Sequence, residues 1–255
     1  MANRPARSLR YEYALFVEEE IENYKESIPR SALLSIGDEA VAVLSQESQL
    51  VLTELMLAEE VDRIIFRRLR LPSYQTWRRR RLKLLREIRR PEHWGLQADD
   101  VVVRTLRPTD DARVLVAGSA AEASALYLAA NGCDVTAVSN EEDAVERVLT
   151  AAAAAGLGER IHAHRADWTD WLPETELDAV IVMSTALKGL TNAQRARVIE
   201  LLQGATADGG IHLVHAPQSQ QTPSLQDLEK RYHGWAVSLE RDGSHEILLA
   251  RKEMT

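Results

Sequence analysis

Short apolar runs alternate with helical patterns along the second half of the chain, and this alternation constrains the fold more than any other feature. Runs rich in Val, Ile, Leu and Ala have strand length, and the segments between them carry Ala and Leu at helical spacing. Repeated strand–helix units predict a parallel sheet with right-handed crossover connections. The predicted strands are 113–117, 134–138, 161–165, 178–183 and 211–215.

The end of the chain predicts an antiparallel edge to this sheet. Residues 235–240 and 245–250 are strand-like and flank the turn sequence Arg241-Asp-Gly-Ser244, which is typical of a β-hairpin. Before it, Thr191 and Gln194 have the spacing of a capping box that opens a helix. The predicted fold class is therefore α/β, with a seven-stranded, mostly parallel, Rossmann-like sheet over residues 105–255.

The first 104 residues show no strand-like alternation. Apolar side chains recur at helical spacing over 11–26, over a long segment from about Asp38 to Arg70, and over 73–90. Pro72 and Pro91 follow the last two segments, and proline interrupts helices. We predict an all-helical N-terminal region, 1–104, followed by an α/β domain, 105–255.

Charge is concentrated in one block of an otherwise acidic chain. The net charge is -8, yet residues 61–90 hold twelve basic and two acidic side chains. Arg79, Lys83, Arg86 and Arg90 follow one another at spacings of four, three and four, which places them on one face of a helix. One interpretation is a solvated face that pairs with acidic helices of the same chain, around Glu18–Glu20 and Glu59–Glu60. The other is a docking face for an anionic partner.

Composition narrows the partner and the compartment. The chain is acidic as a whole and shows no stacking-aromatic module, so nucleic acid is disfavoured. The candidate partners are a protein with an acidic surface and a membrane-protein complex at an anionic membrane face. One cysteine, Cys133, excludes a disulfide framework, and no apolar run approaches the ~20 residues of a membrane span. We expect a cytoplasmic protein, with a peripheral position at the membrane as an option.

The run from Val114 to Val138 resembles the opening of a class I S-adenosylmethionine (SAM) methyltransferase, and within it 126–137 is most similar to the tellurite-resistance methyltransferase branch. Ser184-Thr-Ala-Leu and Thr206-Ala-Asp-Gly-Gly210 occupy the places where that family has the end of its fourth strand and the turn before its fifth. The resemblance covers about 105–250. It implies the seven-stranded methyltransferase sheet, and it implies SAM as cofactor if the site is intact.

The cofactor loop departs from the family pattern, which is an acidic residue followed by Gly-x-Gly-x-Gly. Aligned without gaps, the acidic position is Val116 and the glycine positions are Gly118, Ala120 and Glu122. Glycines let the backbone adopt conformations that a side chain blocks. A carboxylate at Glu122 is also expected to repel the methionine carboxylate of SAM.

The ribose site departs from the family as well. The family has an acidic residue at the end of the second strand, where this chain has Ser139. Two lost hydrogen bonds to a charged acceptor would cost roughly 3–6 kcal/mol, or about two to four decades in affinity. Asn140 or Glu141 could replace part of that loss.

Two functions from different classes follow from these departures. The leading hypothesis is a methyltransferase-like pseudoenzyme without cofactor or catalytic residue, a scaffold or interaction protein in a larger assembly. The alternative is a SAM-dependent methyltransferase acting on a small molecule, with Gly118, Ser119, Ser139 and Asp167 lining the cofactor. No metal site is predicted, because His162 and His164 share a strand face without a third ligand at a supporting spacing.

Overall fold

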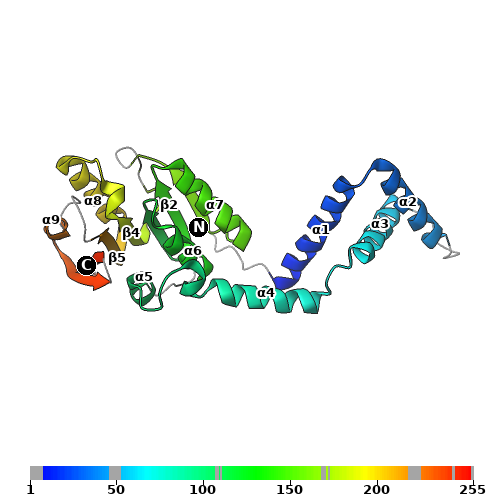
Figure 1. Cartoon of the computed structure of the whole chain (residues 1–255), viewed down its shortest axis with the longest axis horizontal. Coiled ribbons are helices and arrows are strands. Elements are labelled where there is room, and N and C mark those ends of the chain that lie inside the picture. Colours follow the sequence, from blue (N-terminus) through cyan, green and yellow to red (C-terminus); the bar gives the residue numbers. More distant parts are fainter. Residues whose placement is uncertain are drawn as a thin grey trace. The chain divides into compact units, whose positions relative to one another are not determined.

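The computed structural model describes residues 8–45, 53–106, 109, 111–167, 171, 173–217, 225–242 and 245–253 (Figure 1). The chain forms two compact units, Met1–Leu84 and Leu85–Thr255. These units are defined by contacts, so they do not test the predicted domain boundary after residue 104, which stays a prediction.

The first unit is helical. Its helices are α1 (Leu9–Ser27), α2 (Arg30–Leu44), α3 (Glu54–Leu69) and the first turns of α4 (Tyr74–Ile88). Its core contains Ile21 of α1, Ile36 and Ala40 of α2, and Ile64 and Ile65 of α3, all buried.

The prediction of one long helix from Asp38 to Arg70 is wrong. α2 ends at Leu44, α3 begins at Glu54 after the N-cap Thr53, and the two helices pack against each other. In one straight helix Ala40 and Ile64 would be about 36 Å apart, whereas here they share a core. Residues 46–52, where the single helix would have continued, lie outside the described residues.

Aromatic rings join α1 to the start of α4. Tyr13 lies 5.5 Å, centroid to centroid, from both Tyr74 and Trp77, and its hydroxyl donates to the carbonyl of Pro72 at 2.9 Å. Phe16 extends the cluster toward Trp77. Half-buried aromatic pairs of this geometry add to simple area burial, so the first turn of α4 is held against α1.

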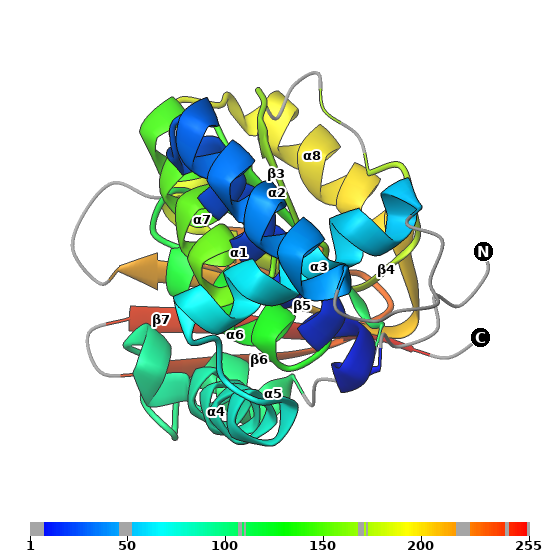
Figure 2. The ribbon, with the colours of Figure 1, turned by 90° about the vertical axis from the view of Figure 1, so that its right-hand side faces the viewer.

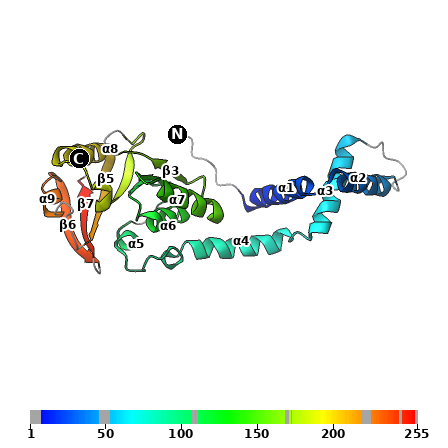
Figure 3. The ribbon, with the colours of Figure 1, turned by 45° about the horizontal axis from the view of Figure 1, so that its top comes forward.

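The second unit is built on the predicted sheet. Its seven strands have the order β3-β2-β1-β4-β5-β7-β6, and β7 runs antiparallel to both neighbours. Figure 2 and Figure 3 show β5, β7 and β6 at one side of this sheet. The predicted fold class, a mostly parallel methyltransferase-like sheet with an antiparallel edge pair, is confirmed. The strands are β1 (Arg113–Ala117), β2 (Asp134–Ser139), β3 (Ile161–Arg165), β4 (Leu177–Met183), β5 (Thr206–Pro217), β6 (Trp235–Asp242) and β7 (His245–Lys252).

Helices cover both faces of the sheet. One face packs against α5 (Val101–Thr105), α6 (Glu122–Ala130) and α7 (Glu142–Ala155), and the other against α8 (Asn192–Ala205) and α9 (Leu225–Glu229). Two 3-10 helices, η1 (Pro91–Trp94) and η2 (Ser184–Leu187), complete the unit. The predicted capping box of α8 is confirmed. Residues 243 and 244 of the predicted hairpin turn lie outside the described residues.

A buried polar chain links the first residue and the middle of β5 to Tyr232, which precedes β6. His212 Nε2 lies 2.7 Å from Thr206 Oγ1, and His212 Nδ1 lies 3.0 Å from the Tyr232 hydroxyl. Thr206 Oγ1 donates to the carbonyl of Leu202 at 2.6 Å, so Nε2–H must be the donor to Thr206. The Tyr232 hydroxyl can then donate to an unprotonated Nδ1. Burial, followed by the charge of Lys252, lowers the pKa of His212 to about 3.

Among the described residues, no helix combines the length and the apolar character needed to cross a membrane.

Candidate functional site

The turn after β1 requires the glycine that the sequence retains. Gly118 has φ +106, and its N–H donates to the carbonyl of Val138 at 2.9 Å. A Cβ at this position would lie 3.0 Å from Met183 Cβ and 3.2 Å from Ala186 Cβ. The turn thus brings the end of β1 into close contact with the end of β4, which a larger residue would prevent.

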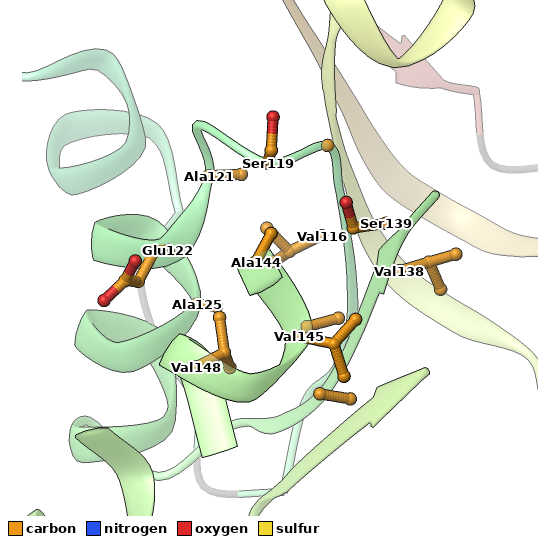
Figure 4. Close-up of a pocket in the computed structure, with 13 residues that line it drawn as sticks. Val116, Ser119, Ala121, Glu122, Ala125, Val138, Ser139, Ala144, Val145 and Val148 are labelled. Carbon is orange, nitrogen blue, oxygen red and sulfur yellow. The ribbon is translucent and has the colours of Figure 1, made fainter. Parts of the chain in front are cut away.

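A carboxylate stands beside this turn, two residues beyond the end of β2. Ser139 is buried, and its Oγ accepts from the backbone N–H of Glu141 at 3.1 Å. Ser119 Oγ donates to Glu141 Oε1 at 3.2 Å, and Figure 4 shows Ser119 and Ser139 on adjoining segments. The structure therefore joins two predicted site residues, Ser119 and Ser139, through Glu141.

Glu122, whose carboxylate was expected to repel SAM, has a basic partner. It is the first residue of α6, and its carboxylate accepts from Arg147 Nε of α7 at 3.3 Å. Figure 4 shows the carboxylate directed away from the small pocket beside the turn. The arginine lies 25 residues along the chain, and its positive charge opposes the effect of the carboxylate on an anion nearby. The expected repulsion stays a prediction.

The small pocket beneath the turn is too small for a cofactor. Its volume is about 10 Å³, and apolar side chains such as Val116, Ala144 and Val148 line most of it (Figure 4). That volume is about the room that one water needs. A nucleoside at this edge would have to lie outside the carboxyl ends of the strands, where open α/β sheets bind their ligands.

Asp167 lies at the same edge of the sheet. It is exposed, two residues past the end of β3, and its carbonyl accepts from the N–H of Trp171 at 3.1 Å. Because β1, β2 and β3 are parallel neighbours, the segments carrying Gly118, Ser119, Ser139 and Asp167 leave the sheet on one side. The predicted cofactor-binding residues therefore share this edge.

Ser184 adds a hydroxyl that the sequence did not single out. It is the first residue after β4 and is fully buried, and its Oγ has no hydrogen-bond partner within the described ranges. Buried polar atoms almost always have a partner. A bound molecule or water is therefore expected to supply one, close to the Gly118 turn.

The predicted docking residues are placed along α4 and just beyond it. Arg79, Lys83 and Arg86 are exposed, and the described part of the chain offers none of them a carboxylate within 4.0 Å. Arg90 lies two residues past the end of α4 and pairs with Glu87 at 3.7 Å. Among the described residues, no ion pair joins Arg79, Lys83, Arg86 or Arg90 to the acidic helices with which this face was expected to pair.

The family follows from a sequence match over the sheet. The family model described as "Tellurite resistance protein TehB" matches residues 97–230, more than half of the chain. The chain belongs to the TehB family. The predicted resemblance to class I SAM methyltransferases, and to their tellurite-resistance branch, is thereby confirmed.

Two solved methyltransferase-fold structures are similar to this chain. TehB from Haemophilus influenzae superposes with a TM-score of 0.53 at 18% identity, covering 62% of this chain and 63% of that one, and so shares the fold. The N-methyltransferase NodS from Bradyrhizobium japonicum gives a TM-score of 0.47 at 16% identity, over 72% of this chain and 99% of that one. The chain thus spans less than two thirds of the H. influenzae TehB structure. No curated protein matches its sequence.

Proposed function

We propose that this TehB-family chain is a SAM-dependent methyltransferase that acts on a small molecule. The observation that carries the proposal is the bridge from Ser119 to Glu141, which sets a carboxylate beside the β1 turn. The sequence alignment had left the ribose position without an acid at Ser139. Membership of the TehB family supports the same function.

The residues at this edge fit the adenosyl group. Glu141 can accept the ribose hydroxyls, while Ser139 holds the Glu141 backbone through its N–H. The Gly118 turn presents no side chain, and Glu122 is engaged by Arg147. When bound, SAM supplies an electrophilic methyl group on a sulfonium. The chain has to hold the methyl donor and the acceptor in line, because proximity and alignment remove much of the activation barrier of methyl transfer.

The substrate we propose is a small, soft nucleophile. The family's name refers to tellurite resistance, and a polarisable oxyanion or thiol-like group attacks a methyl sulfonium without help from a general base. No base of the described site is required by this chemistry. Selenite and tellurite are therefore the first substrates to test.

Glu141→Gln is expected to weaken SAM binding by about 10–100-fold, because a hydrogen bond to a charged acceptor contributes roughly 1.5–3 kcal/mol. Calorimetric titration with SAM and S-adenosylhomocysteine measures the change. Glu142→Gln is the matched control, since that neighbouring acid pairs with Arg165 at 3.1 Å instead. Absence of binding by the wild-type chain at millimolar SAM would exclude the methyltransferase.

A second candidate function is a non-catalytic interaction protein that docks through α4. The observation that favours it is the row of exposed bases, Arg79, Lys83 and Arg86, which have no carboxylate partner in the described ranges. The fitting partner is a protein with an acidic surface, or a membrane-protein complex at an anionic membrane face. Counted with Arg90, four basic charges near an anionic bilayer give roughly 4 kcal/mol, only millimolar binding, so a membrane role needs a protein partner as well.

Reversing two of these charges tests the docking face. With the double variant Arg79→Glu, Lys83→Glu, the recovered amount of any partner that co-purifies with the wild-type chain should fall at least tenfold. The reason is that attraction to an acidic surface becomes repulsion. Native mass measurement of the recovered complexes gives the readout. Arg67→Glu, Arg197→Glu changes the net charge equally on other exposed surfaces. A partner retained equally by both variants would contradict docking through α4.

A further inference from the structure

A second and much larger cavity lies at the opposite edge of the sheet. Its volume is about 480 Å³, and it is formed at the amino-terminal ends of β1 and β4, beside β5 and the end of β7. The end of α5 and the residues around the end of α6 complete its wall. The apolar part of the lining includes Leu106, Val114, Leu128, Ala179 and Ile211.

The lining changes from apolar and buried to charged and exposed. Val114, Leu128 and Ala179 are all less than 5% exposed and belong to the core on the α6 face. Arg104 and Arg251 also line the cavity and are exposed. A molecule that enters past the arginines would therefore place its far end against aliphatic side chains.

Among the described lining residues, the rim carries one positive charge in excess. Arg104 pairs with Glu240 at 3.1 Å, and the Asp178 carboxylate accepts from the backbone N–H of Arg113 at 2.7 Å and lies 3.6 Å from its guanidinium. Within the described ranges, Arg251 is within 4.0 Å of no carboxylate. Arg251 is thus a guanidinium on an apolar cavity, ready to pair with an anion.

The proposed methyl transfer leaves this cavity unused, because the candidate cofactor residues lie at the carboxyl ends of the strands. Protein interiors are otherwise closely packed, and 480 Å³ is within the range of small-molecule sites. We propose that the cavity binds a small organic anion whose apolar body lies on Val114, Ala179 and Ile211 and whose carboxylate pairs with Arg251. This site is separate from the proposed function and does not depend on it.

The test compares two probes of equal chain length and opposite charge. Decanoate, titrated calorimetrically into the full chain, should bind at least tenfold more tightly than decyltrimethylammonium. Arg251→Gln should weaken decanoate binding about tenfold. Arg197→Gln, which removes the same charge from the exposed side of α8, should leave it unchanged. Equal binding of the two probes, or equal behaviour of the two variants, would overturn the proposal.

A filling variant checks the location. Ala179→Leu adds three carbons to the cavity wall and should abolish decanoate binding, while the thermal unfolding transition shows that the chain remains folded. SAM titration of the same variant should match the wild type, because Ala179 lies at the other end of β4. Full decanoate affinity in folded Ala179→Leu would place the anion elsewhere and overturn the proposal. Absence of SAM binding by the wild type would affect only the proposed function.

Discussion

Lowering the pH from 6.5 to 4 is expected to reduce the free energy of unfolding by about 3 kcal/mol through His212 alone. Burial holds the pKa of this imidazole at about 3 in the folded chain, against an ordinary value near 6.5. Between those two values only the unfolded chain binds the proton, so each step toward acid favours unfolding. Above pH 6.5 neither state is protonated and this contribution to the pH dependence vanishes.

Burial, rather than a missing hydrogen-bond partner, opposes protonation of this imidazole. Nε2 donates to Thr206, and Nδ1 lies 3.0 Å from the Tyr232 hydroxyl, which can donate to the neutral ring. Protonating Nδ1 would turn that hydroxyl from donor to acceptor and would place a positive charge in a buried layer. The Trp235 ring centroid lies 4.7 Å from that of His212.

Urea unfolding at a series of pH values measures this effect. His212→Gln retains one donor and one acceptor but does not titrate, so its stability should fall less steeply than that of the wild type between pH 6.5 and 4. His162→Gln changes an exposed histidine of β3 and should keep the wild-type slope. Parallel curves for wild type and His212→Gln would show that the imidazole is not the titrating group.

Gly118→Ala is expected to lower the free energy of unfolding by about 2–6 kcal/mol. At φ +106 an alanine is strained, and its Cβ would lie 3.0 Å from Met183 Cβ and 3.2 Å from Ala186 Cβ. Both neighbours present Cβ atoms fixed to their backbone, so relief requires η2 to move away from β1. The same movement would disturb the edge where we place the adenosyl group, and SAM binding should weaken with stability.

Two other glycines separate the causes. Gly189 has φ +88, and no atom lies within 4 Å of the position that an alanine Cβ would take there, whereas Gly158 has open space without a positive φ. Gly189→Ala should therefore show the backbone strain alone, and Gly158→Ala should change stability little. Chemical denaturation ranks the three variants. If Gly118→Ala lowered the free energy of unfolding no more than Gly189→Ala, the contacts with Met183 and Ala186 would add nothing to the backbone strain.

The sheet could be predicted because its signal is local. β1 and β4 are apolar runs, and β3, in which Ile161 and Ala163 alternate with histidines, occupies the predicted 161–165. The reversal of the chain between α2 and α3 could not be predicted, because helical periodicity continues across a segment whether or not the chain folds back there. Packing of Ala40 against the Ile64 side of α3 decides that point.

The site was less predictable because its partners are distant in sequence. Ser119 and Glu141 are 22 residues apart, and Glu122 and Arg147 are 25 apart. An alignment compares one position at a time, so it recorded a missing acid at Ser139 and a misplaced one at Glu122. The sequence pointed to Glu141 only as one of two partial replacements, because its hydrogen bond with Ser119 is a tertiary contact.

The strand order leaves β3 at one margin of the sheet, bonded only to β2. Unpaired backbone at such a margin invites strands from other molecules, and proteins discourage this with charged or bulky polar side chains. Here His162, His164 and Arg165 are all exposed along a five-residue strand. The exposed polar side chains of β3, the edge strand, are therefore expected to oppose fibril-like growth from this side of the sheet.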